Sequence, residues 1–310
     1  PLQTVRNDFD SSRTEIAIVS GGTAAVITDS LGGGKLGALL DFRDQVLNPA
    51  QNSLGRVAVS LGTVFNIQHT AGMDFNGVAG VNYFSVTTPL VAGSTNNTGS
   101  AVVTAAFDNA NIGNLTTEDY TLAFNGTVWS LSRVSDGQSV AMTGTGIPGD
   151  PFLFDGLSVQ VTVGALAGDR FQIRPTRSGA AGMGVLISSP REIAAAAPAA
   201  SSAPGDNSNA LLLAGLQTSQ TMENGTTSFQ GAYGQLIAQL GTQTRSAEIS
   251  AEAQGALRAQ AQESRDALSG VNLDEEAADL IRFQQAYQAI AQVISVADST
   301  FQTLLSAIGR

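Results

Sequence analysis

The side chains that could support catalysis or metal binding are few in this 310-residue sequence. It contains no cysteine and one histidine, His69. Zinc sites, thiol nucleophiles and disulfide scaffolds need cysteine or several histidines, so the composition excludes all three. No G-x-S-x-G or similar nucleophile motif accompanies His69, and we expect it to be a structural or loop histidine. Calcium sites built from carboxylates alone are the metal chemistry that the composition still allows.

Three short motifs with possible chemistry have simpler explanations. Gly144–Gly149 has the letters G-x-G-x-x-G, but it contains Pro148 and no helix follows it, so it predicts a turn. Gly32–Lys35 lacks the Gly-Lys-Ser/Thr ending of a phosphate-binding loop and predicts a flexible lead into a helix. An acidic cluster comprises Asp274, Glu275, Glu276 and Asp279. On a helix these carboxylates would fan around the axis, so we predict no catalytic residue, no cofactor and no metal.

Charge and hydropathy limit the possible partners. Fifteen Lys and Arg against 26 Asp and Glu give a net charge of −11. This sign disfavours binding to nucleic acid and to anionic membranes. No apolar run approaches the ~18 residues that a membrane span needs, and no basic region followed by an apolar core marks a signal peptide at Pro1. We therefore expect a chain cut at its N-terminus, with no cleavable signal in this sequence.

The first 75 residues predict a small β element followed by helix. Alternating apolar residues around Gly21-Gly22 predict two strands joined by a glycine turn within 1–30. Residues 31–75 carry apolar side chains at alternating spacings of three and four, which predicts a helical rod segment. Pro49, preceded by Asn48 as a cap, is expected to kink or restart this helix. The helical stripe comprises Leu36, Leu40, Leu47, Ala50, Leu54, Val57, Leu61 and Val64.

Residues 76–190 predict an inserted β-rich outer domain. Asn125-Gly126 separates two short strand patterns and predicts a type I′ hairpin, on which Phe124 and Trp129 form a core or cross-strand pair. Turn signals recur at roughly ten-residue spacing, which favours a sandwich or an open barrel. Further strands are predicted at 83–86, 102–107, 140–142, 157–163 and 170–174. The Ala- and Pro-rich residues 191–204 then predict a linker.

Residues 205–270 predict the second part of the helical rod domain, ending at Gly270 as a C-cap. Asn272 caps a further helix over 271–310, with three carboxylates in its first turn. Steps of four and three along this helix trace a heptad seam. The seam comprises Leu273, Ala277, Leu280, Gln284, Tyr287, Ala291, Ile294, Asp298, Phe301, Leu305 and Ile308. A terminal helix with one apolar stripe needs a partner to bury it.

The predicted fold class is therefore α+β. Long antiparallel helices form a rod-like layer, an antiparallel β domain is inserted between them, and a heptad helix ends the chain.

The segment Asn272–Ile294 closely resembles the C-terminal signature of bacterial flagellar axial proteins. Its form Phe283-Gln-Gln-Ala-Tyr287 is similar to the hook-associated protein 1 family of hook–filament junction proteins. Gly33–Pro49, Gly168–Pro175 and Gly205–Leu211 support the resemblance. It implies that 271–310 lines the inner layer of the axial structure, that 31–70 and 205–270 form a second layer, and that 76–190 projects outward. The family's N-terminal helical segment has no counterpart here.

The resemblance also implies a role, a location and partners. The chain would be a non-enzymatic structural adapter in the extracellular flagellum, exported unfolded through the flagellar type III apparatus. Its partners would be copies of itself in a ring, the hook protein, the second hook-associated junction protein and an export chaperone on the C-terminal helix. An alternative is a secreted, adhesin-like module that binds a surface ligand through 76–190. A third alternative, an enzyme in the β domain, would need two carboxylates converging in a pocket.

Overall fold

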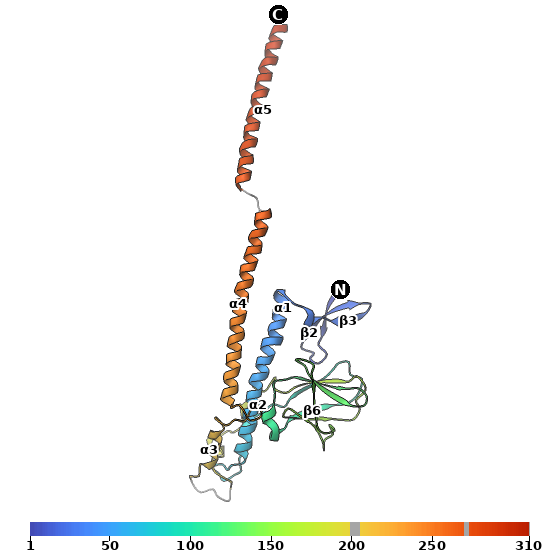
Figure 1. The fold of residues 1–310 in the computed structure, drawn as a ribbon, viewed down its shortest axis with the longest axis vertical. Coiled ribbons are helices and arrows are strands. Elements are labelled where there is room, and N and C mark those ends of the chain that lie inside the picture. Colours follow the sequence, from blue (N-terminus) through green and yellow to red (C-terminus); the bar gives the residue numbers. More distant parts are fainter. Residues whose placement is uncertain (199–204, 270–272, 310) are drawn as a thin grey trace. The chain divides into compact units, whose positions relative to one another are not determined.

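The computed structural model describes residues 1–198, 205–269 and 273–309 (Figure 1). Backbone contacts divide the chain into two compact units, Pro1–Thr244 and Arg245–Arg310. The first unit contains the described strands and the helices up to the beginning of α4 (Phe229–Ser269), and the second contains the rest of α4 and α5 (Leu273–Ile308). Long helices combine with antiparallel sheets, which confirms the predicted α+β class. Gly270 and Asn272, the predicted caps, lie outside the described residues.

The N-terminal element is a three-stranded sheet of β1 (Leu2–Arg6), β2 (Thr14–Ser20) and β3 (Thr23–Val26) in sequence order. Gly21 and Gly22 have φ angles of 60° and 85° and make the predicted turn between β2 and β3. The sequence did not predict β1, which pairs with β2 from Leu2↔Ile18 to Arg6↔Thr14. This strand is almost entirely exposed, so it lacks the apolar alternation that marks a half-buried strand.

The helix changes type just before Pro49, in line with the expected kink or restart, but the predicted cap at Asn48 is wrong. Helix α1 (Gly34–Asp41), a π-helical segment η2 (Phe42–Leu47) and α2 (Asn48–Thr70) follow one another with helical dihedrals at both junctions. The N–H of Asn48 donates to the carbonyl of Arg43, five residues earlier. This wider turn accommodates Pro49, which has no N–H for the α-helical ladder, without ending the helix. Asn48 itself is helical and caps nothing.

The β domain consists of two facing sheets. One has the order β5-β12-β7-β8-β9, and the other has the order β10-β11-β6. The first sheet comprises β5 (Leu90–Gly93), β12 (Arg170–Arg174), β7 (Tyr120–Phe124), β8 (Trp129–Arg133) and β9 (Ser139–Val140). The second comprises β10 (Phe152–Phe154), β11 (Leu157–Val161) and β6 (Val103–Phe107). A separate pair joins β4 (Phe84–Ser85) to β13 (Gly184–Val185). The sequence missed β5, β10 and β13, which have four residues or fewer.

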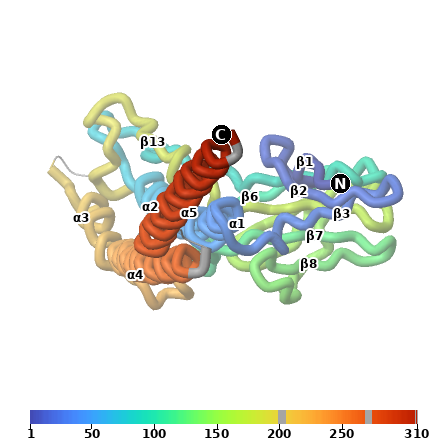
Figure 2. The backbone as a smooth tube through the Cα atoms, turned by 90° about the horizontal axis from the view of Figure 1, so that it is seen from above, coloured from blue at the N-terminus to red at the C-terminus, as the bar shows by residue number. Residues whose placement is uncertain are grey.

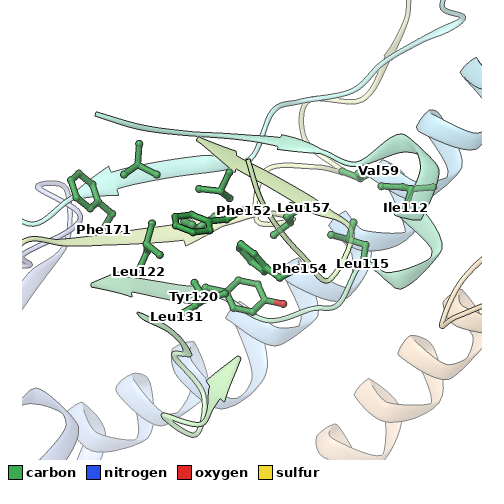
Figure 3. Close-up of a cluster of buried hydrophobic side chains, with 13 residues drawn as sticks. Val59, Ile112, Leu115, Tyr120, Leu122, Leu131, Phe152, Phe154, Leu157 and Phe171 are labelled. Atoms are coloured by element: carbon green, nitrogen blue, oxygen red, sulfur yellow. The ribbon is translucent and has the colours of Figure 1, made fainter. Parts of the chain in front are cut away.

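The core of this domain lies between the two sheets. Tyr120 and Leu122 on β7 face Phe154 and Leu157 of the other sheet (Figure 3). The Tyr120 hydroxyl donates to Asp155 Oδ2 at 2.7 Å, so the one polar atom of that ring is satisfied. Inward and outward residues alternate along β7 and β12, as in a sandwich.

The β7–β8 hairpin differs from its predicted type. Phe124 pairs with Trp129, so the loop between the strands has four residues. Gly126 has a φ of 98°, whereas Asn125 keeps a negative φ. A type I′ turn needs positive φ at both central residues, and the prediction is therefore wrong. Asn125 closes the loop with its side chain, because its Oδ1 accepts the N–H groups of Thr127 and Val128, each at 2.9 Å.

The helices of the first unit form a second, smaller core. Met222, Phe229 and Ala232 are buried against Val57, Leu61 and Val64 of α2. The short helix α3 (Ser208–Gly215) packs on the last turns of α2 through Asn209, whose side chain is bonded to Gln68. Helix α4 begins at Phe229, directly after this core's Met222 loop.

Asp169 organises the loops at one end of the β domain. Its carboxylate accepts backbone N–H groups from Leu166 at 2.9 Å, Thr98 at 2.9 Å and Gly99 at 3.2 Å. These bonds favour the ionised form and lower the pKa of Asp169 below its ordinary value of 3.8. A lowered pKa stabilises the folded state above pH 3.8, and this stabilisation is lost as the pH falls through the folded pKa.

We predict that Asp169→Asn lowers the melting temperature at pH 7, because its amide group places a donor against backbone donors. The difference from the parent protein should shrink as the pH falls from 3.8 through the lowered pKa of the folded state, where the parent carboxyl also becomes protonated. Thermal unfolding followed by circular dichroism between pH 2.5 and 7 would measure both effects. Asp41→Asn, at an exposed position on α1, is the control. Equal melting temperatures of the Asp169 variant and the parent at pH 7 would contradict this account.

Candidate assembly surface

Helix α5 is long and has no buried side chain between residues 274 and 307. It has 36 residues, or ~54 Å at 1.5 Å per residue. All side chains in this range are exposed except that of Asp279, which is half-buried. Asp274, Glu275 and Glu276 lie in the first turn, where the helix dipole favours negative charge. The acidic cluster thus has a structural role at the start of the helix.

The predicted seam lies along this exposed helix. Its bulky members Leu280, Tyr287, Ile294, Phe301 and Leu305 are between 57% and 76% exposed. The smaller or polar members Ala277, Gln284 and Ala291 are exposed as well. Leu273 and Ile308 belong to α5, but their side chains lie outside the described residues. The described apolar members therefore offer a face that no other part of the second unit covers.

The apolar face is wider than the sequence analysis recognised. Phe283, Ile290 and Leu304 are also more than half exposed, at 66%, 58% and 55%. They repeat every seven residues beside the predicted seam, with Ala297 completing the row. Alternate steps of three and then four residues from Leu280 reach an apolar residue each time. The predicted seam takes the steps in the opposite order and includes Gln284 and Asp298. The order of three before four is therefore the signal in the sequence that indicates this second row.

His69 is structural, as expected. Its ring is completely buried on α2. Nε2 accepts the N–H of Ala194 at 3.0 Å, so the proton must be on Nδ1, which donates to the carbonyl of Val81 at 2.6 Å. The neutral ring thus joins two loops to the end of α2.

Two other motifs also take structural roles. Gly144–Gly149 forms the predicted turn, with Ile147 bridged to Asp150. Trp129 packs on Phe124 across the hairpin, with ring centroids 4.9 Å apart. Among the described residues, no group of His, Asp or Glu side chains could hold a metal ion. Within the same ranges, no helix combines the length and the apolarity that a membrane span needs.

A cavity of about 680 Å³ lies in the first unit, between the β1–β2 loop, α2 and the β domain. Carboxylates line its walls, and an enzyme in this region would need two of them to converge. Three of its carboxylates are engaged in short ion pairs with guanidinium groups. Arg13 lies 3.0 Å from Glu15 and 3.3 Å from Asp44, and Arg177 lies 2.7 Å from Asp119. This pairing holds the walls of the cavity together.

Arg177 is the centre of the joint between α2 and the β domain. Its Nε donates to Asn52 Oδ1 at 2.8 Å, its Nη1 to Asn48 Oδ1 at 2.7 Å and its Nη2 to Asp119 Oδ2 at 2.7 Å. Asn52 also donates to Asp119 and to the carbonyl of Thr117. Burial raises the pKa of Asp119 above its ordinary value, although Arg177 and Asn52 oppose this shift.

Three family models match successive parts of the chain. The helical domain of flagellar hook-associated protein FlgK matches residues 1–84, and the D2-like domain of flagellar hook-associated protein 1 matches residues 92–175. The C-terminal region of flagellar basal body rod FlgEFG proteins matches residues 265–307. Flagellar hook-associated protein 1 of Escherichia coli K12 is 34% identical over 307 residues, which cover 98% of this chain and 55% of that protein. The chain belongs to the flagellar hook-associated protein 1 family.

Other members of the family agree. The protein of the same name from Salmonella typhimurium LT2 is 33% identical over 314 residues, with 98% of this chain and 56% of that protein covered. The structure of the flagellar hook junction protein FlgK from Burkholderia pseudomallei matches with a TM-score of 0.74 and 25% identity, over 86% of this chain and 70% of that chain. The chain spans a little over half the length of the two relatives matched by sequence. The resemblance inferred from the residues is confirmed.

We predict that Arg177→Met destabilises this family member by ~3 kcal/mol, because it leaves the Asp119 carboxylate buried without its counter-charge. The matched control is Arg133→Met, which breaks the exposed ion pair with Asp136 on the β8–β9 turn and should cost much less. Urea unfolding at pH 7 would measure both free energies. Equal losses in the two variants would show that the Arg177 joint is no stronger than a surface pair.

Proposed function

We propose that this chain is a structural, non-enzymatic adapter at the hook–filament junction of the extracellular bacterial flagellum. It polymerises there through its terminal helices. The family supports the location, since its described members are named for the hook or the hook junction. Because the chain spans only part of those relatives, the role is our proposal for the whole protein.

The observation that carries this function is the apolar face of α5. Phe283, Tyr287 and Ile294 are each more than 60% exposed on a helix that buries none of its described side chains. Burial of such groups contributes roughly 1.5–3 kcal/mol each, so a helix with many of them gains most by packing against other helices. Apolar residues at alternating three and four spacing suit helix-to-helix packing in a bundle. An axial assembly of many copies provides such neighbours.

The same face requires protection before assembly. An exposed apolar helix promotes premature association in the cytoplasm. We propose that an export chaperone covers the α5 face in a helix-in-groove complex until the chain is exported. After export, the face is buried among copies of this chain, in contact with hook protein on one side and the second hook-associated junction protein on the other.

We predict that Leu280→Asp or Ile294→Asp prevents assembly. A charge buried in an apolar helix interface without a partner costs ~3 kcal/mol or more, which weakens binding about a hundredfold. The variants would be expressed as full-length genes in a strain that lacks the protein. Electron microscopy should then show hooks without filaments, flagellin should appear in the medium, and chaperone pull-down should fail.

The matched control is Gln292→Asp, which adds the same charge on another side of α5. It should restore filaments and retain the chaperone. A gene that ends after Gly270 should fail in the same way as Leu280→Asp. Normal motility and normal pull-down yield with Leu280→Asp and Ile294→Asp, or normal filaments in the strain that lacks the gene, would overturn the proposed function.

A further inference from the structure

Two exposed apolar surfaces flank the C-terminal end of α2 in the first unit. The first, which we call the loop–β13 face, comprises Phe75, Val78, Val81, Val185 and Leu186, between 54% and 74% exposed. The second, which we call the α3 face, comprises Leu211 and Leu212, at 64% and 58% exposed. Strand β13 and helix α3 lie on different sides of α2 (Figure 2). A scattered exposed leucine needs no explanation, but clusters of this size do.

The backbone brings the members of the loop–β13 face together. Val185 pairs with Phe84, and the N–H of Leu186 donates to the carbonyl of Tyr83, two residues after Val81. Phe75 lies on the same loop as Val78 and Val81, and the Arg191 guanidinium covers its ring at 4.6 Å. Asp74 and Arg191 thus border the face with opposite charges. An apolar centre with a polar rim is the usual anatomy of a protein interface.

The segments that form both surfaces carry no charge in a strongly acidic chain, although Arg191 covers the ring of Phe75 at the edge of the loop–β13 face. Residues 75–81, 182–190 and 207–217 contain no Asp, Glu, Lys or Arg, although the net charge is −11. Two copies of this chain repel each other wherever their carboxylates face one another. They can approach closely at low electrostatic cost through segments that carry no carboxylate. Charge therefore favours a second copy as the occupant. A strongly basic partner would instead bind where the chain exposes its carboxylates.

One hydrogen-bonded framework holds both surfaces rigidly on α2. His69 binds the carbonyl of Val81 on one side and the N–H of Ala194 on the other. The carbonyl of Ala194 then accepts from Asn209 Nδ2 at 2.6 Å, and Asn209 lies on α3 beside the α3 face. Asn209 Oδ1 in turn accepts from Gln68 Nε2 at 2.6 Å. Surfaces fixed in this way lose little conformational entropy on binding.

We infer that the loop–β13 face of one copy packs against the α3 face of the next copy. This inference rests on the proposed function, because it names the contact between copies in the ring. The two surfaces differ and lie on different sides of α2, so the contact is head-to-tail. A head-to-tail contact adds each copy in the same sense and closes into a ring or continues as a helix.

The absence of cysteine from the sequence provides a direct test. A disulfide needs Cα atoms within ~7 Å, so it forms quickly only between surfaces in contact. Two full-length genes would be co-expressed in the strain that lacks the protein, one with Val78→Cys or Val185→Cys and the other with Leu211→Cys or Leu212→Cys. Flagella would be isolated, oxidised mildly and examined for covalent dimers. At least one mixed pair should give about tenfold more dimer than either variant expressed alone, a ratio equivalent to ~1.4 kcal/mol.

Ile147→Cys, 55% exposed on a β-domain turn, replaces either partner as the matched control and should give only background dimer. Incorporation of the chain into flagella with no mixed dimer above this control would overturn the inference and leave the proposed function standing. Absence of the parent chain from isolated flagella would overturn the proposed function and the inference with it. Leu212→Asp combined with Val78→Cys and Leu211→Cys should reduce the mixed dimer to background, and an unchanged yield would also contradict the contact.

Discussion

The hydrophobic effect acting on one uncovered helix is the constraint on which the rest of this structure depends. Helix α5 exposes Leu280, Phe283 and Tyr287 on one side and has no other element of its unit against that side. A soluble monomer gains nothing from such a face, whereas an assembly of many copies buries it and gains free energy with each side chain covered. The proposed function rests on this need for neighbours, and so does the proposed cover by a chaperone before export.

The first unit differs from α5, because its elements are joined to one another by internal polar contacts. Arg177 binds Asn48, Asn52 and Asp119 together, and His69 joins Val81 to Ala194. Buried polar groups of this kind are costly unless each is satisfied, so they admit few alternative arrangements. They hold the β domain and the loops around α2 in fixed positions on one long helix. A rigid unit that presents its surfaces in fixed positions suits a structural component.

Similar polar contacts engage three of the carboxylates that line the cavity of this unit. Glu15, Asp44 and Asp119 are each within 3.3 Å of a guanidinium group. The ion pairs fix the orientation of these three carboxylates. Their contribution is mechanical, because they connect the β1–β2 loop, α2 and the β domain.

The sequence alone determined the elements whose signal is local or periodic. The helices, the strand pairs around Gly21-Gly22, the heptad stripe of α5 and the flagellar family all follow from spacing and short motifs. The tertiary structure decided what depends on contacts distant in the sequence. Strand β1 forms because it pairs with the edge of β2. Asn48 is not the predicted cap, and its side chain accepts a hydrogen bond from Arg177. Asn125 closes a four-residue loop with its side chain. The heptad spacing contains the second apolar row of α5, but the exposed fractions of its side chains are what show the full width of the face. Backbone periodicity is encoded in neighbouring residues, whereas polar partners and uncovered surfaces depend on where the folded chain places remote ones.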